Sequence, residues 1–270
     1  MVKVTFNTLN PNAPLFTELN SGKYVWWKKV KSDARLYIEI RKDNNINVYF
    51  QGGSVVRLHY CSKHKKIQAF THRKYLYGGD EYGYVDCFSS LDNDLEKIIN
   101  NIPLKYSGKK GHEKEKWSEK YIQSQYIIKN HPKYIDSEFS YKDESFDIRI
   151  DLVECVNGEL RFVELKRLDD GRMLKKTDEC PEVVEQVKAY KGFICQYEKD
   201  IVEYYKKIWA IKNKLGLINP EKCPSSLAKS PLLLIFNQWT YKTKRRTEHT
   251  YRMEEILKRE SIDYVIESEI

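Results

Sequence analysis

The sequence predicts a protein of the mixed α/β (α+β) class, in which a smaller β-rich region precedes a region with a mixed central sheet. Three observations support this prediction. Residues 35–71 contain four alternating or apolar runs separated by turn signals, as in an antiparallel meander. Asn157-Gly158 connects two runs of apolar and β-branched residues and therefore predicts a hairpin. The run 231–236 is almost entirely apolar, which is typical of a buried strand covered on both faces.

We expect two domains, a β-rich N-terminal domain at residues 1–105 and a larger α/β domain at residues 111–270. Pro103 and the polar, glycine-containing stretch 105–111 predict the boundary between them. In the first domain, strands are expected at residues 35–41, 46–51, 54–60 and 66–71, followed by a short helix at 91–100.

The second domain is expected to contain an αβββαβ core, with one further helix inserted before its last strand. Pro181 suits the first turn of one helix, and Gly216 suits the end of another. The expected elements are a helix at 113–129, strands at 136–141, 147–155 and 160–167, helices at 181–195 and 199–215, a strand at 231–236, a helix at 247–260 and a strand at 263–266.

Composition limits the classes of function. The chain has 270 residues, and its 47 lysines and arginines exceed its 39 acidic residues, giving a formal net charge of +8 that favours a polyanionic partner. The sequence has no apolar run of the ~18 residues that a membrane span needs, and its N-terminus has no signal-peptide core. The six cysteines form no C-x-x-C pair, so we expect free thiols and a cytoplasmic location.

Two acidic residues and a lysine are expected to meet at one place on the second sheet. Residues i and i+2 of a strand project to the same face, so Glu164 and Lys166 lie together. The hairpin at Asn157-Gly158 places Asp151 on the neighbouring strand, close to Glu164. Adjacent carboxylates need a cation, and oxygen ligands suit Mg²⁺ or Mn²⁺. A lysine beside such an ion can orient a bound water or help to deprotonate it.

These residues, Asp151 followed by Glu164-Leu165-Lys166, resemble the signature of the PD-(D/E)XK nuclease superfamily. Gln186-Val187-Lys188-Ala189-Tyr190 also resembles the Gln-x-x-x-Tyr helix of its RecB-like and NucS-like branches. Ser118-Glu119-Lys120-Tyr121-Ile122 resembles the first helix of NucS-like nucleases. The resemblance covers residues 113–195, and the chain departs from the family name at Ile150, where the name has proline.

The resemblance implies a restriction-endonuclease-like fold with a catalytic metal. In that case Asp151, Glu164 and the main-chain carbonyl of Leu165 would hold Mg²⁺ or Mn²⁺. Glu119 would complete the acidic set, with Glu115 as its substitute.

The resemblance also implies roles for residues that do not hold the metal. Lys166 would position the attacking water, while Gln186 and Tyr190 would brace the site. The implied activity is a metal-dependent DNA nuclease, expected to be an endonuclease that hydrolyses phosphodiester bonds in DNA repair, restriction or antiphage defence. Two alternatives remain open. One is a catalytically inactive nucleic-acid-binding or assembly protein on the same fold, and the other is a protein-interaction module.

Basic residues in two regions are candidates for DNA contacts. Next to the site, the basic loop at 167–177 contains Arg172, Lys175 and Lys176. In the N-terminal domain basic and aromatic residues are interleaved, a pattern that suits a nucleic-acid surface but also suits a charged face over an aromatic core. A homodimer or a partner protein could use the N-terminal domain or the 199–215 helix. The N-terminal candidates are Lys28, Lys29, Lys65 and Lys66, with Trp26 and Trp27 beside them.

Overall fold

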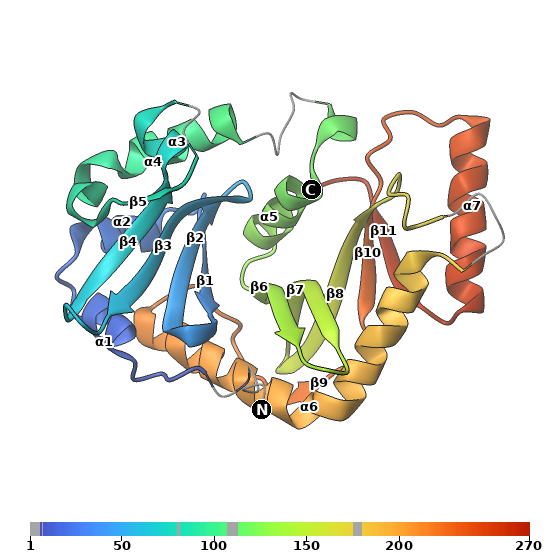
Figure 1. The fold of residues 1–270 in the computed structure, drawn as a ribbon. Helices are drawn as coiled ribbons and strands as arrows, with labels where there is room; N and C mark the ends of the chain where they lie inside the picture. The colour runs from blue at the N-terminus through green and yellow to red at the C-terminus, as the bar shows by residue number, and fades with distance from the viewer. Residues whose placement is uncertain (1–5, 7, 80–81, 107–112, 175–179) are drawn as a thin grey trace.

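A computed structural model describes residues 6, 8–79, 82–106, 113–174 and 180–270. The chain forms two sheets that stand side by side, and the long helix α6 (Glu182–Leu215) runs along one end of both (Figure 1). The first sheet has the strand order β1-β2-β3-β4-β5 and the second has the order β11-β10-β8-β7-β6, with β9 beside β8. The predicted mixed α/β class is therefore confirmed.

The first sheet is an antiparallel meander, as predicted from the turn signals between its strands. Burial alternates along β4, where one face packs on the core, whereas β2 has four consecutive buried residues and is covered on both faces. The strands are β1 (Tyr37–Arg41), β2 (Asn45–Phe50), β3 (Gly53–Cys61), β4 (Lys66–His72) and β5 (Tyr84–Asp86).

Four helices cover this sheet, and three of them were not predicted. The unpredicted helices are α1 (Pro14–Asn20), α2 (Val25–Ser32) and α3 (Arg73–Tyr77), which are too short to show a clear helical period. The fourth, α4 (Leu91–Lys105), includes Pro103 in its last turn and runs five residues past the end expected at residue 100, so that helix end is wrong.

Trp26 and Trp27 point into the core from α2. Each is 2% exposed, so neither ring is available to stack on a nucleic-acid base. The expectation of an aromatic nucleic-acid surface is therefore wrong for these two residues. Because α2 buries a stripe formed with Val30, its lysines lie on the outer face over an aromatic core.

The second sheet is mixed. Strands β6 (Tyr134–Lys142), β7 (Asp147–Val156) and β8 (Glu159–Arg167) are antiparallel. The turn at Asn157-Gly158 has positive φ at both residues, 54° and 87°, as a type I′ hairpin requires. The parallel strands β10 (Leu232–Phe236) and β11 (Asp263–Glu267) extend the sheet beyond β8, and the remaining elements are β9 (Ser226–Leu227), α5 (Glu119–Lys129) and α7 (Lys244–Arg259).

The helices of the second region also differ from the predicted ones, and the helix expected at 247–260 begins three residues earlier, at Lys244. The helix expected at 113–129 begins at Glu119, because the Ser118 hydroxyl accepts a hydrogen bond from the Tyr121 main-chain N–H at 3.1 Å and caps it there. The helices expected at 181–195 and 199–215 form one helix, α6, which is kinked at Tyr197. No glycine or proline lies at the kink, so the helix continues through it instead of ending there. In the described part of the chain, no helix is both long and apolar enough to cross a membrane.

A buried ionic network joins the two sheets to α6. Arg41 of β1 donates hydrogen bonds to Asp136 Oδ1 of β6 at 3.0 Å and to the Ser137 carbonyl at 2.5 Å. Tyr205 of α6 donates to the other oxygen of Asp136 at 3.1 Å. The side chain of Asp136 is 3% exposed, so its charge depends on these partners.

A second buried ion pair lies on the same junction. Lys212 of α6 donates to the Ile135 carbonyl at 2.5 Å, and its Nζ lies 3.7 Å from Glu39 Oε2. Burial raises the pKa of Glu39 to about 8.

The two regions also share one hydrophobic cluster, which includes Ile40 and Phe139. Of the expected boundary at 105–111, residues 107–111 lie outside the described residues, so the division into two domains stays a prediction.

We expect Asp136→Asn to destabilise the protein by about 3 kcal/mol, because it leaves the Arg41 guanidinium buried without a full counter-charge. Urea denaturation at neutral pH measures this loss. Glu18→Gln removes an exposed ion pair with Lys23 and is the matched control, expected to cost roughly 0–1 kcal/mol. Equal small losses for both variants would contradict a stabilising role for the buried network.

Candidate active site

The site lies where the pairing of β7 with β8 ends and its pairing with β6 is interrupted at one position. Pairing between β7 and β8 ends at Leu152–Val163, so Asp151 is the first residue beyond the ladder. The main-chain N–H of Leu165 donates to Asp151 Oδ2 at 2.9 Å. On the other side, Gln123 of α5 donates to the Asp151 carbonyl at 2.5 Å. Asp151 is therefore fixed at both its carboxylate and its backbone.

A strained residue faces Asp151 from the other neighbouring strand. The β6–β7 pairing includes Ser137 and Phe139 but not Glu138, which the register would place opposite Asp151. Glu138 has a φ of 54°, a left-handed conformation that is costly for a residue with a Cβ. Its side chain forms an ion pair with Lys120 of α5. Sequence analysis missed Glu138, because only the three-dimensional register reveals the irregularity.

Glu164 is buried and fully bonded. It is 2% exposed. Its Oε1 accepts hydrogen bonds from Lys166 Nζ and from Gln186 Nε2, the latter at 2.7 Å. Its Oε2 accepts from the Tyr190 hydroxyl at 2.8 Å. The structure thus brings together four of the residues expected at the site, from β8 and α6.

The Lys166 ammonium lies among the oxygens expected to hold a metal. Lys166 is 1% exposed. Its Nζ donates hydrogen bonds to Glu164 Oε1 and, at 3.1 Å, to the Leu165 carbonyl. It lies 3.8 Å from Asp151 Oδ2. A buried ammonium needs a counter-charge, and both nearby carboxylates supply it. The three oxygens therefore converge on one position that already holds a positive charge.

Gln186 and Tyr190 reach the site from the first turns of α6. Four residues apart on a helix, they project to the same side, and Gln186 Nε2 donates to the Tyr190 hydroxyl at 2.6 Å. The Tyr190 hydroxyl also lies against the Arg149 carbonyl of β7. This pair therefore connects α6 to both β7 and β8 and fixes the orientation of Glu164.

Three acids near the site hold their protons more tightly than usual. Burial raises the pKa of Asp151 and of Glu119. Burial, together with the negative charge of Asp151, raises the pKa of Glu164 to about 7. The Lys166 ammonium opposes all three shifts without cancelling them. Such a group of acids is stabilised by any additional cation.

Glu119 lies nearby but is not bonded to the other two acids. Its carboxylate is 3.8 Å from Arg172, which is also bound to Asp170 at 2.5 Å. Glu115, its expected substitute, instead forms an ion pair with Arg246 at 3.1 Å. Among the residues that the structure describes, no group of three or more His, Cys, Asp and Glu side chains is arranged to hold a metal ion. The expected acidic set is thus only partly assembled.

The basic residues expected to contact DNA are spread over the molecule. Lys28 and Lys29 are exposed on α2, and Lys65 and Lys66 are exposed at the turn between β3 and β4. Arg172, next to the site, is the one candidate from the 167–177 loop that can be placed. Lys175 and Lys176 lie outside the described residues.

A hollow of about 680 Å³ opens beside Asp151. It is lined by side chains from α5, β6 and β7, including Lys120, Glu138 and Arg149. Its lining is largely polar and charged, which suits an ionic ligand better than an apolar one.

Comparisons of the chain with known protein families, with curated proteins and with solved structures find no match.

The raised pKa of Glu164 predicts how stability changes with pH when no metal is present. The folded protein holds this proton up to about pH 7, whereas an ordinary glutamate loses it near 4.5. The free energy of unfolding should therefore fall as the pH rises from about 5 to 7.5, by roughly 1–3 kcal/mol.

Urea denaturation in EDTA across this pH range measures the effect. Glu164→Gln should remove this part of the pH dependence, so its stability relative to wild type should rise with pH. The exposed Glu203→Gln on α6 is the control, and its curve should stay parallel to that of wild type. A parallel curve for Glu164→Gln as well would show that the Glu164 carboxyl titrates normally.

Proposed function

We propose that this protein is a metal-dependent DNA nuclease that hydrolyses phosphodiester bonds on a restriction-endonuclease-like core. The observation that carries the proposal is the convergence of Asp151 Oδ2, Glu164 Oε1 and the Leu165 carbonyl on one buried cation, the Lys166 ammonium. The order α5-β6-β7-β8-α6-β10 supports it, because it follows the αβββαβ order that the resemblance to PD-(D/E)XK nucleases implies.

The donor set fits a hard divalent cation. All three donors are oxygens, two of them are carboxylates, and both carboxyl pKa values are raised by burial. Mg²⁺ or Mn²⁺ would be held by Asp151, Glu164 and the Leu165 carbonyl, with Glu119 the nearest further acid. When bound, such an ion would supply positive charge to a phosphate and its leaving oxygen and lower the pKa of a water.

The protein's own residues would prepare this chemistry. Gln186 and Tyr190 hold both oxygens of Glu164, and the Leu165 N–H holds Asp151, so neither carboxylate needs to be ordered when a ligand arrives. Lys166 carries three N–H donors on a flexible chain. If another cation neutralised the carboxylates, the Lys166 ammonium would be free to donate a hydrogen bond to a water or to a phosphate oxygen. We assign it the role of orienting the attacking water.

The competing function is a nucleic-acid-binding protein that has lost catalysis. The complete set of Asp151, Glu164 and Lys166, braced by two residues of α6, favours the enzyme, because a binding protein has no need to bury Glu164 and Lys166 together beside a second, partly exposed acid. The two functions differ in one result. The nuclease cuts DNA with Mg²⁺ or Mn²⁺ present, whereas the binding protein retains it intact.

Cleavage assays on single-stranded, duplex, flapped and branched DNA test this proposal. Wild type should cut at least one substrate with Mg²⁺ or Mn²⁺ and none in EDTA. Lys166→Met should lower the cleavage rate by roughly 10²–10⁴, the range for a group that positions a transferred proton. Lys206→Met changes a lysine on the outer side of α6 and should leave the rate unchanged.

Because Lys166 is buried, circular dichroism must show that the Lys166→Met variant is folded. If it is unfolded, Glu164→Gln replaces it, since that change keeps the shape of the side chain and should abolish cutting. Wild-type rates in a folded Lys166→Met variant, or unchanged cleavage by wild type in EDTA, would refute the proposed mechanism.

A further inference from the structure

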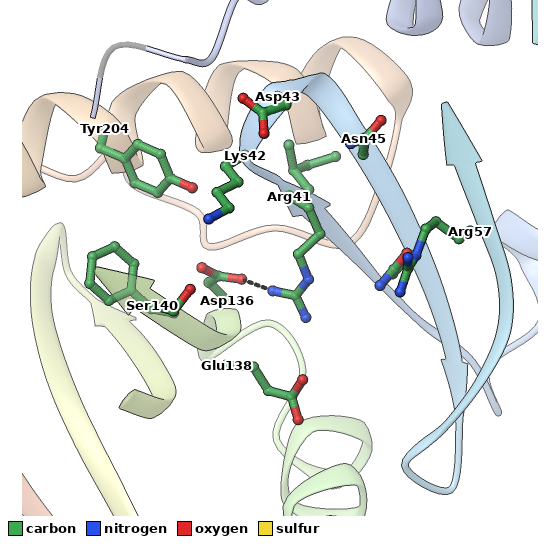
Figure 2. A pocket seen from close by; sticks show the side chains of 12 residues that line it. Arg41, Lys42, Asp43, Asn45, Arg57, Asp136, Glu138, Ser140 and Tyr204 are labelled. Carbon is green, nitrogen blue, oxygen red and sulfur yellow. Dashed lines mark hydrogen bonds and ion pairs between the residues drawn. The ribbon is translucent and has the colours of Figure 1, made fainter. Parts of the chain in front are cut away.

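The hollow beside Asp151 continues into a second hollow between the two sheets. The second has a volume of about 250 Å³ and is lined by residues of β1–β3, β6 and α6 (Figure 2). The two hollows share four lining residues, Lys42, Glu138, Phe139 and Ser140. They therefore form one continuous groove, which begins at Asp151 and ends at Arg57 on the first sheet.

Side chains from both sheets face each other across this groove. Figure 2 shows Arg41 and Arg57 of the first sheet, with Lys42 of the turn between β1 and β2, opposite Asp136 and Glu138 of β6. Lys42 leads into a tight turn at Asp43 and Asn44, both with left-handed φ values of 63° and 60°. The Asn44 side chain anchors that turn by donating to the Thr8 carbonyl at 3.2 Å. Lys42 is thus presented by a fixed segment of the chain.

Most acids of the groove are neutralised within the protein. Asp136 is paired with Arg41 at 3.0 Å, and Asp147 is paired with Lys142 at 2.6 Å. Glu138 is paired with Lys120. Apart from Asp151 itself, Asp43 is the remaining acid among the described residues that line the groove.

The groove therefore has basic side chains with charge to spare. Lys42 and Arg57 are exposed, and among the described residues neither has a carboxylate within ion-pair distance. The Arg57 guanidinium instead lies 5.4 Å from the centre of the Tyr84 ring, which leaves its N–H donors available. Arg149, at the other end, is 85% exposed and 4.0 Å from Asp147. The lining carries six lysine and arginine side chains and five acidic ones, so the surplus of positive charge is small. It is Lys42 and Arg57, which have no close acidic side chain among the described residues, that suit the phosphates of a polyanion.

We propose that this groove carries the phosphodiester backbone of the substrate from the active site to the first sheet, with Lys42 and Arg57 contacting phosphates beyond the scissile one. This inference rests on the proposed nuclease function for the identity of the substrate. Neutral polar residues between the cations, such as Asn45 and Ser140, add hydrogen-bond donors of the kind that contact phosphate and sugar oxygens. The first sheet is then part of the substrate-binding surface.

The groove and the lysines of α2 are alternative DNA surfaces. Lys28 and Lys29 lie on the outer face of α2 and, among the described residues, are not part of the groove lining. Lys29 instead donates to the Asp92 carbonyl of α4 at 3.2 Å. Removing two charges from either place changes the net charge of the protein equally. A comparison of the two pairs therefore separates a local contact from a general electrostatic effect.

The test is DNA binding by the full-length protein in EDTA, where no cutting occurs. Fluorescence anisotropy with a labelled 30-nucleotide single strand and a 30-base-pair duplex gives the affinity over a series of salt concentrations. Lys42→Gln/Arg57→Gln should weaken binding and flatten the dependence of log affinity on log salt by about 1.8 for duplex or about 1.4 for single strands. Whichever DNA shows the change identifies the form that occupies the groove.

Lys28→Gln/Lys29→Gln is the matched comparison and should leave this slope close to the wild-type value. An unchanged slope for Lys42→Gln/Arg57→Gln, or equal changes of slope for the two double variants, would overturn the inference. Displacement of the DNA by poly-glutamate at equal charge concentration would assign the groove to acidic polypeptides and overturn it as well.

The outcome for the nuclease proposal is separate. If Lys42→Gln/Arg57→Gln flattens the salt dependence of binding but wild type cuts no DNA with Mg²⁺ or Mn²⁺, DNA binding in the groove is supported and the nuclease proposal fails. If wild type cuts DNA and Lys42→Gln/Arg57→Gln binds DNA as wild type does, the nuclease proposal is supported and the proposal of DNA binding in the groove fails.

Discussion

The candidate site depends on one buried interaction, the Lys166 ammonium between two carboxylates. Burying a lysine at 1% exposure is unfavourable unless opposite charge and hydrogen bonds surround it, and Glu164, Asp151 and the Leu165 carbonyl meet that need. Burial raises the pKa of Asp151, and burial together with the charge of Asp151 raises the pKa of Glu164, although Lys166 opposes both shifts. If the proposed function holds, Lys166 and a divalent ion would be alternative cations for the same oxygens.

One helix connects this site to the rest of the protein. At its start, α6 places Gln186 and Tyr190 on Glu164, and more than ten residues later it places Tyr205 and Lys212 on β6 and β1. The helix therefore holds the second sheet at the carboxylates and holds the first sheet against it. A groove between two sheets fixed in this way can bind an extended ligand without first ordering its walls.

The features of the fold and of the site that could be predicted are those that depend on local sequence. The Asn157-Gly158 turn and the i, i+2 spacing of Glu164 and Lys166 led directly to the hairpin and to the meeting of the acids with the lysine. Other features were not predictable, because they depend on contacts between segments far apart in the chain. The left-handed Glu138 opposite Asp151 reflects the register of β6 and β7. The burial of Trp26 reflects packing of a helix too short to show its period.

The most direct test of the central claim is a crystal structure of the wild-type protein soaked in Mn²⁺, with anomalous scattering recorded to locate the ion. We predict an anomalous peak bounded by the carboxylates of Asp151 and Glu164 and the Leu165 carbonyl. The Lys166 ammonium should no longer contact all three oxygens. A saturating soak that gives no peak at this position, with Lys166 still bound between the two carboxylates, would contradict the account.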